Sequence, residues 1–372
     1  MEPIAETTTP PAHSGGAAGT DAERRAAVHL RERLSSLGRD AESQTIGIRP
    51  RFGLAHAIHA FVAIVGSVVA AGNPALGAVI VSAAAVSTFL DVAGIFHLAR
   101  RLTGERASQN VESLEDGGKP GTLILVAGYD APRASGAFDR ARRTLRDPWL
   151  VMLVAMLAIL ACCVLRLVGI ENQALTAVQF VPTVLLIVLT PAFVDIELAE
   201  AAEDATQAGA VATVLRLSGE LRLENFDVWV VLAGAEEPFA LGMGGWLRRR
   251  RKQLDRESTA VLHVSSVGDG PVRYARRVGP LAPLRCHRDL VRLCGEIAED
   301  DGDGGVYSAE SRVDRRPTAA AAAIARGLPA ITVGCAGREA PSAEALERAH
   351  GFCAELARRL DAEVGPALAR PE

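Results

Sequence analysis

Apolar and polar residues follow two different patterns along this chain. In one part, short apolar runs alternate with amphipathic stretches, which is typical of the strands and helices of an α/β domain. In another part, long runs carry no charged residue at all, and the first of them extends from Phe52 to Leu90. The two patterns predict one α/β domain into which long apolar helices are inserted.

The alternating part predicts strands and helices in turn. Short runs rich in β-branched residues predict strands over residues 42–49, 108–113, 121–127, 226–233, 259–265 and 329–334. Helical periodicity predicts helices over residues 20–37, 199–218, 239–253, 285–298, 318–326 and 342–363. Thr20 and Asp21 are suitable caps for the first helix, and Gly38 is a suitable stop.

The uncharged runs predict two transmembrane hairpins. Gly72-Asn73-Pro74 divides the first run into residues 54–72 and 75–98, and a second hairpin comprises residues 148–165 and 172–194. Each segment is long enough to cross a hydrocarbon core of roughly 30 Å. Buried helices of a soluble protein are the alternative, which we disfavour because these runs are apolar on every face.

These elements divide the chain into six consecutive parts. A disordered leader without a signal peptide is followed by three pieces of the α/β domain that are separated by the two hairpins. The ranges are 1–19 for the leader, 20–50, 105–147 and 196–366 for the α/β domain, and 52–99 and 148–195 for the hairpins.

Arginines near the ends of the spans predict the orientation in the membrane. On the side shared by both termini lie Arg49, Arg51, Arg100, Arg101, Arg106, Arg140, Arg142, Arg143 and Arg146. The turns on the opposite side contain only Arg166. Because basic residues stay on the cytoplasmic side, we expect a multi-pass protein of the inner membrane, embedded in the lipid bilayer, with its α/β domain and both termini in the cytoplasm.

Composition excludes some classes of function. The net charge of −4 and the short, separate arginine blocks give no reason to expect nucleic-acid binding. The run at residues 248–252 is a solvated helix face or a contact for anionic lipids. Six cysteines without metal-site spacing are typical of small buried side chains in a reducing compartment.

Two adjacent acids are the first candidates for chemistry. A buried strand over residues 226–232 ends in a turn of small residues and then presents Glu236 and Glu237 before a helix. At the carboxyl edge of an open α/β sheet, one acid could hold a cation while the other moves protons. Alternatively, both acids only favour the positive end of the following helix.

Four segments in succession resemble the core of the M28 family of zinc aminopeptidases. They are GTLILVAGYDAPRASGAFD, AEDATQAGAVATVLRLSGEL, FDVWVVLAGAEEPFALG and VDRRPTAAAAAIARGLPAITV. The resemblance covers residues 20–50 and 108–365 apart from the second hairpin. It implies a three-layer αβα fold with a mixed sheet.

The resemblance also implies roles for individual residues. Glu236 corresponds to the general base of the family, Glu237 to the metal ligand that follows it, and Asp130 to the residue that orients the first ligating histidine. For the aspartate that bridges two zinc ions, Asp204 is the better candidate and Asp139 the poorer one.

The remaining ligand positions depart from the family pattern. Gly128 stands where the family has its first histidine, Ser265 where it has a further acidic ligand, and Arg315 where it has the last histidine, after a retained Asp314. Glycine, serine and arginine cannot supply the donors that zinc requires. The fixed charge of Arg315 is expected to replace the metal and to pair with Glu237 or Glu236.

A rebuilt site with one metal ion is the alternative. His263 lies two residues before Ser265 on the same strand, so the two side chains share a face. His263 could therefore join Glu237, Asp204 and Asp130 around a single zinc ion. Otherwise His263 is a core histidine with a backbone partner.

Three functions follow from this sequence. The first is an inactive pseudopeptidase without zinc, in which the remnant of the site binds a peptide or a protein. The second is an active membrane-bound aminopeptidase with a rebuilt zinc site. The third is a small transporter or scaffold, which would need paired charges within the membrane. The sequence offers no such pair, and His56, His59 and His97 are read as groups that make hydrogen bonds between helices.

Overall fold

A computed structural model describes residues 16–145, 147–302 and 305–368. Residues 1–15 of the expected leader and Arg146 lie outside the described residues. Contacts divide the chain into an α/β unit, residues 1–48, 107–132 and 202–372, and a helical unit, residues 49–106 and 133–201. The chain passes between these two units four times.

The α/β unit is built on a mixed sheet of nine strands in the order β1-β2-β4-β3-β5-β9-β6-β7, with β8 paired to β6. The strands are β1 (Glu42–Ile48), β2 (Arg106–Ser113), β3 (Gly121–Gly128), β4 (Phe226–Ala233), β5 (Thr259–Val264), β6 (Val272–Val278), β7 (Leu284–Arg285), β8 (Glu310–Asp314) and β9 (Ala330–Cys335). Strands β4, β3, β5 and β9 run parallel, and β2 and β6 run antiparallel to β4 and β9.

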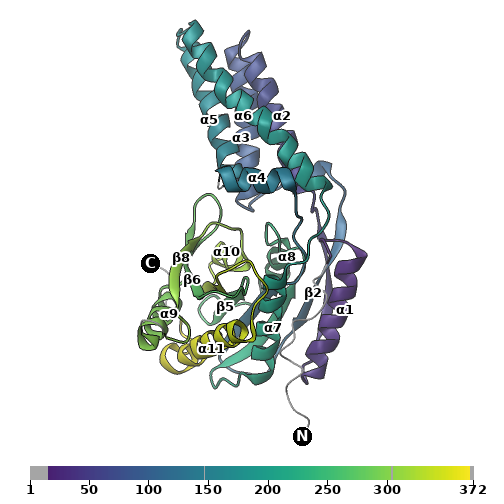
Figure 1. The fold of residues 1–372 in the computed structure, drawn as a ribbon, viewed down its shortest axis with the longest axis vertical. Helices are drawn as coiled ribbons and strands as arrows, with labels where there is room; N and C mark the ends of the chain where they lie inside the picture. The colour runs from purple at the N-terminus through teal and green to yellow at the C-terminus, as the bar shows by residue number, and fades with distance from the viewer. Residues whose placement is uncertain (1–15, 146, 303–304, 369–372) are drawn as a thin grey trace. The chain divides into compact units, whose positions relative to one another are not determined.

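Helices cover both faces of this sheet. Nearly every residue of the four parallel strands is buried, and since side chains alternate between the two faces of a strand, both faces must be covered. The helices are α1 (Asp21–Ser36), α7 (Ala205–Glu220), α8 (Leu241–Arg250), α9 (Arg288–Asp301), α10 (Ala319–Ile324) and α11 (Ala343–Arg359). Helix α11 packs against α7 and α9, while α10 packs against α8 (Figure 1). The expected mixed α/β sheet with helices is therefore confirmed.

The helical unit contains four long apolar helices. They are α2 (Phe52–Val69), α3 (Pro74–Val92), α5 (Pro148–Leu167) and α6 (Gln173–Leu198), and all four are long and apolar enough to cross a membrane, by length and composition. Asn73, Asp147 and Asn172 each cap the following helix through a side-chain oxygen. Proline at the first position of α3 and α5 suits a helix start, because its missing N–H would have no partner there.

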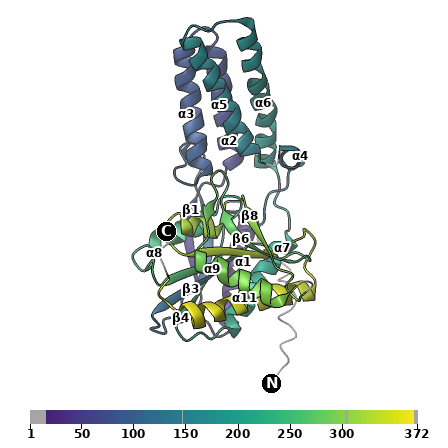
Figure 2. The ribbon, with the colours of Figure 1, turned by 90° about the vertical axis from the view of Figure 1, so that its left-hand side faces the viewer.

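A short helix, α4 (Gly136–Leu145), lies across the direction of the four long helices (Figures 1 and 2). Its buried Phe138 packs against the rings of Trp149 and Phe193, with centroids 5.6 and 5.8 Å away. Residues 49–50, 105–106, 133–145, 147 and 196–201, assigned above to the α/β domain, belong by their contacts to the helical unit. The sequence did not predict α4.

Strands β6, β7 and β8 were also not predicted. Strand β6 reads VRYARRV, in which three arginines hide the alternation of buried and exposed positions. Strand β7 has only two residues and pairs with the end of β6. The following helix therefore begins at Arg288 and not at the expected residue 285. The other expected strands are present within a few residues of their predicted bounds.

Candidate functional site

The parallel strands bring several of the predicted residues to one edge of the sheet. Gly128 at the end of β3 is paired with Ala233 at the end of β4, and His263 in β5 is paired with Val126 and with Thr332 in β9. Residues that follow the carboxyl ends of these strands must therefore meet. They include Asp130 after β3 and Glu236 after β4.

Asp130 holds the turn that carries the two adjacent glutamates. Its side chain is buried, and its two carboxylate oxygens accept the backbone N–H groups of Glu236 and Glu237 at 2.7 and 3.2 Å. This arrangement fixes the direction of the chain after β4. Asp130 is thus a positioning residue for the glutamate pair, whereas the resemblance implied that it would orient a ligating histidine.

Glu236 is a buried acid with little compensation. Among the described residues, neither of its carboxylate oxygens has a hydrogen bond of normal geometry. Burial, and then the charges of Asp130 and Glu237, raise the pKa of Glu236 well above its ordinary value; the N–H groups of Ala319 and Met243 oppose this shift only in part. Glu237, the next residue, is exposed.

Gly128 leaves no room for a side chain at the position of the first ligand. A Cβ atom added to Gly128 would lie 2.7 and 2.8 Å from Cβ and Cγ of Glu236 and 3.0 Å from Nε2 of Gln207. Gln207, in the first turn of α7, is buried and was not predicted. Its place three residues after Asp204, a helix cap, is the only signal for it in the sequence.

Asp204 caps helix α7. Its Oδ1 accepts the N–H groups of Thr206 and Gln207 at 2.9 and 3.4 Å and the Thr206 hydroxyl at 2.7 Å. The other candidate for the bridging position, Asp139, lies in α4 of the helical unit. Only Asp204 therefore belongs to the unit that carries Glu236.

The arginine that meets the acidic residues is Arg316 and not Arg315. Arg315 is exposed, whereas Arg316 contacts both oxygens of Asp314 with its Nε and Nη2 atoms at 3.1 and 2.9 Å. Arg312 adds a third contact to Asp314 at 2.7 Å. The prediction from the sequence assigned this role to Arg315, one residue earlier. The sequence does not show whether the side chain of Arg315 or that of Arg316 faces Asp314.

The charges of this cluster are mutually stabilising. Burial by itself would raise the pKa of Asp314, but Arg316 and then Arg312 outweigh burial and lower it to about 2. Burial opposes the charged form of Arg316; nevertheless the carboxylates of Asp314, Glu237 and Asp204 raise the pKa of Arg316 above its usual range. Arg316 is therefore a permanent cation that interacts with all three acids.

His263 is buried next to Glu236. Its Nδ1 lies 3.3 Å from the hydroxyl oxygen of Thr332, and its Nε2 lies 3.9 Å from Oε1 of Glu236. Burial, followed by the charge of Arg316, lowers the pKa of His263 to about 3, so the imidazole is neutral. Ser265 follows β5, and its buried hydroxyl has no hydrogen-bond partner among the described residues.

These residues do not fit a zinc ion. Within the described ranges, no three His, Cys, Asp or Glu side chains are placed to hold one metal. Zinc needs three or four donors at roughly 2.0 to 2.3 Å. The oxygens of Asp130 and Asp204 accept backbone N–H groups instead, and Arg316 places a positive charge among the remaining acids.

A second charged cluster lies in the helical unit. Asp91, near the end of α3, is fully buried; its Oδ1 lies 2.9 Å from Nε of the buried Arg100 and 2.5 Å from Nδ1 of His97. Nε2 of His56 lies 3.5 Å from Oδ2 of Asp91. Asp91 lies in α3, one of the candidate spans, whereas Arg100 lies beyond the end of that helix. His59 contacts the Ser87 hydroxyl at 2.8 Å, as expected of a hydrogen bond between helices.

Comparison with known structures identifies the fold. A glutaminyl cyclase from Macrostomum lignano matches with a TM-score of 0.50 and 9% identity, covering 95% of this chain and 87% of that one. A zinc aminopeptidase from Bacillus subtilis matches with a TM-score of 0.50 and 10% identity over 99% and 97% of the two chains. An aminopeptidase from Aneurinibacillus sp. strain AM-1 matches with a TM-score of 0.50 and 12% identity over 99% and 94%.

At these identities the likeness concerns the fold alone. No family model matches this chain, and no curated protein matches it. The mixed α/β sheet is therefore that of zinc aminopeptidases and glutaminyl cyclases, as the order of motifs in the sequence implied for the aminopeptidases.

Proposed function

We propose that this chain is a membrane-anchored, aminopeptidase-like protein whose site binds a peptide or protein without hydrolysing it. One observation carries the proposal. The space that a first ligand would need beside Gly128 is filled by Glu236 and Gln207, with a Cβ atom at Gly128 only 2.7 Å from Glu236. Neighbouring side chains thus occupy the space that the absent ligand would need.

The second support is electrostatic. Arg316 interacts with Asp314, Glu237 and Asp204, which are acids that the resemblance places at or beside the metal centre. A guanidinium can balance these charges with a fixed cation. Unlike zinc, it does not lower the pKa of a bound water molecule to near 7, so Glu236 has no activated nucleophile to deprotonate.

The membrane anchor rests on the four long apolar helices and on the arginines at their ends. We propose the inner membrane, with the α/β unit and both termini in the cytoplasm. The pair of Asp91 and Arg100 is the one observation that favours a transport function. Because Asp91 already contacts Arg100 and His97, we assign this cluster a structural role in the helical unit.

Metal analysis of the detergent-purified chain, combined with assays on aminoacyl and glutaminyl substrates, tests the proposal. We expect no stoichiometric zinc and no turnover, in the wild type as in Glu237→Ala. The single observation in favour of an enzyme is the 3.9 Å approach of His263 to Glu236. About one zinc per chain, lost together with activity in Glu237→Ala, would establish the rebuilt metallopeptidase instead.

A further inference from the structure

Exposed arginines gather on one edge of the α/β unit. Arg276 and Arg277 lie on β6, Arg285 lies on β7, and Arg315 follows β8. All four side chains are exposed. We call these four residues the arginine face.

The pairing of the strands brings like charges together. Arg277 lies directly opposite Arg285 in the antiparallel pair of β6 and β7. Like charges at opposite positions destabilise a sheet. On its other side Arg277 is paired with Val313 of β8, which is 45% exposed. The row formed by Arg285, Arg277 and Val313 across the three strands therefore contains both basic and apolar side chains.

A β-bulge adds to the charge density. The register between β6 and β8 shifts between Ala275 and Arg277, so β6 has one residue more than its partner. An extra residue of this kind turns side chains away from the regular alternation. Arg276 and Arg277 are consequently both exposed, whereas the next residue, Val278, is buried.

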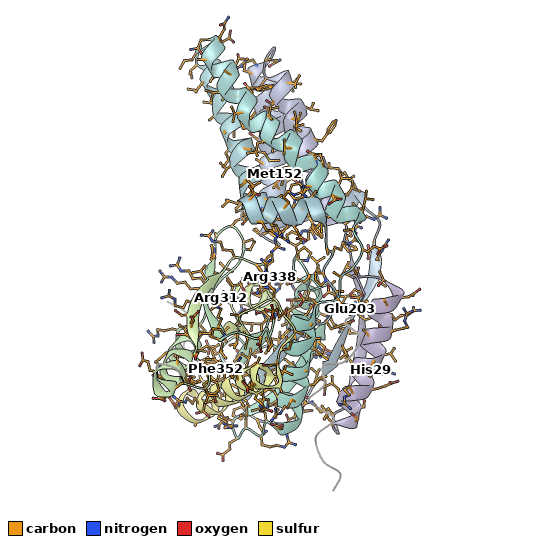
Figure 3. All side chains as sticks on the ribbon, in the orientation of Figure 1. His29, Met152, Glu203, Arg312, Arg338 and Phe352 are labelled. Carbon is orange, nitrogen blue, oxygen red and sulfur yellow. The ribbon has the colours of Figure 1, made fainter. Side chains whose placement is uncertain are left out.

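Acidic residues on these strands neutralise other arginines. Arg273 pairs with Glu310, and Arg312 and Arg316 both pair with Asp314. Among the residues that the structure describes, no carboxylate lies within 4.0 Å of a guanidinium of the arginine face. Around the labelled Arg312, Figure 3 shows long side chains with nitrogen at their tips that project outward from this edge.

We propose that the arginine face docks on the surface of an anionic lipid bilayer. Guanidinium groups form paired hydrogen bonds with phosphate oxygens, and the exposed Val313 suits the apolar layer beneath the headgroups. Phosphate groups also remove the repulsion between Arg277 and Arg285. The arrangement that costs stability within the isolated fold thus becomes favourable at a membrane.

The chain itself favours a lipid partner over an acidic protein. Four crossings of the chain tether the α/β unit to the helices that we propose to span the bilayer. Such a tether makes docking an intramolecular step with a high effective concentration. This argument rests on the proposed membrane anchor.

A fluorescent label on the full-length protein in lipid nanodiscs tests the docking. The label is attached to Val313→Cys, since the six native cysteines are all buried. Nitroxide lipids in the disc quench the label only when the strand lies on the surface. We expect strong quenching in discs of phosphatidylcholine with phosphatidylglycerol, weak quenching in phosphatidylcholine alone, and loss of quenching at high salt.

Two variants separate the arginine face from charge in general. Near an anionic surface each arginine contributes about fivefold to the ratio of docked to undocked protein. Arg277→Glu with Arg285→Glu should therefore lower that ratio at least about 25-fold. Arg25→Glu with Arg31→Glu is the matched control, because it changes the net charge equally at two exposed positions of α1. This control should leave quenching unchanged.

The single variant Arg285→Glu separates docking from folding. It places a carboxylate opposite Arg277, so the melting temperature should not fall although docking weakens. Equal quenching in both lipid mixtures, or equal effects of the two double variants, would overturn the proposal. So would quenching that is lost only when an acidic protein is removed from the sample. Failure of the chain to remain in the discs would instead contradict the membrane anchor.

Discussion

Two buried carboxylates, one in each unit, have opposite surroundings. In the helical unit, Asp91 contacts the guanidinium of Arg100 and the imidazole of His97 at 2.9 and 2.5 Å. In the α/β unit, Glu236 has no hydrogen bond of normal geometry from a described residue. Partners offset the cost of burying a charge, so that removing one partner is destabilising, whereas a buried acid without partners is tolerated only when it is neutral or when a site requires it.

The largest contrast is expected between isosteric amides at these two positions. Asp91→Asn removes the carboxylate nearest to the buried Arg100 and should lower the free energy of unfolding by about 3 to 5 kcal/mol. Glu236→Gln removes an acid that is already poorly compensated, so it should change that free energy by less than about 1 kcal/mol. Denaturant unfolding in detergent, followed by circular dichroism, measures both. Equal losses would contradict the distinction between the two centres.

A third buried acid, Glu23, extends the comparison to pH. Glu23 lies in the first turn of α1, and its carboxylate accepts the Gly19 N–H at 2.6 Å and the Ser108 hydroxyl of β2 at 2.5 Å. Burial nevertheless raises the pKa of Glu23 from 4.5 to about 7. Between these values the folded state binds more protons than the unfolded state, so stability should fall as the pH rises through this window.

The loss from Glu23 should reach up to about 3 kcal/mol above pH 7, because each pKa unit corresponds to about 1.4 kcal/mol. Glu23→Gln cannot ionise; its Oε1 can accept the Gly19 N–H, and its Nε2 can donate to the Ser108 hydroxyl oxygen. The difference in unfolding free energy between this variant and the wild type should therefore grow from acid to neutral pH and then level off. A constant difference across the window would show that Glu23 does not titrate there.

The smallest expected effect sharpens the account of the α/β centre. Arg316→Ala removes one of two arginines from Asp314, and it should cost about 1 to 2 kcal/mol because the Arg316 side chain is 38% exposed and Arg312 remains. Arg315→Ala, at the exposed neighbouring position, is the control and should stay within about 0.5 kcal/mol of the wild type. Thermal unfolding compares the pair. The reverse order would restore Arg315 as the cation of the site.

What could be predicted from the sequence follows the strength of the local signal. The four apolar helices and the buried parallel strands could be predicted, because long uncharged runs and short β-branched runs have few alternative structures. Strands β6 and β8 escaped prediction since their exposed arginines do not alternate with apolar residues. Strand β7 is a strand only through its pairing with β6, which the sequence does not show.

The sequence drew attention to some residues at this edge of the sheet, but not to Gln207 or Arg316, and it does not show the contacts. Motif order singled out Asp130 and Glu236, strand periodicity singled out His263, and the strand register brings their strands together. The choice between Arg315 and Arg316 depends on which side chain faces Asp314, and the role of Gln207 depends on the packing of α7 beside Gly128. Neither of these contacts can be deduced from the spacing of residues along the sequence.

The four chain crossings set the order in which this protein can be assembled at the ribosome. Strand β1 ends at Ile48, but its neighbour β2 begins at Arg106, after the whole first hairpin; β3 ends at Gly128, and β4, which pairs with it, begins at Phe226, after the second. If both hairpins enter the bilayer during synthesis, the central strand β4 is synthesised only after the second insertion. Until then, β4 is missing beside the earlier strands β1, β2 and β3. We therefore expect the sheet to close only late in translation, and a stall between the hairpins to leave exposed strands that chaperones or proteases recognise.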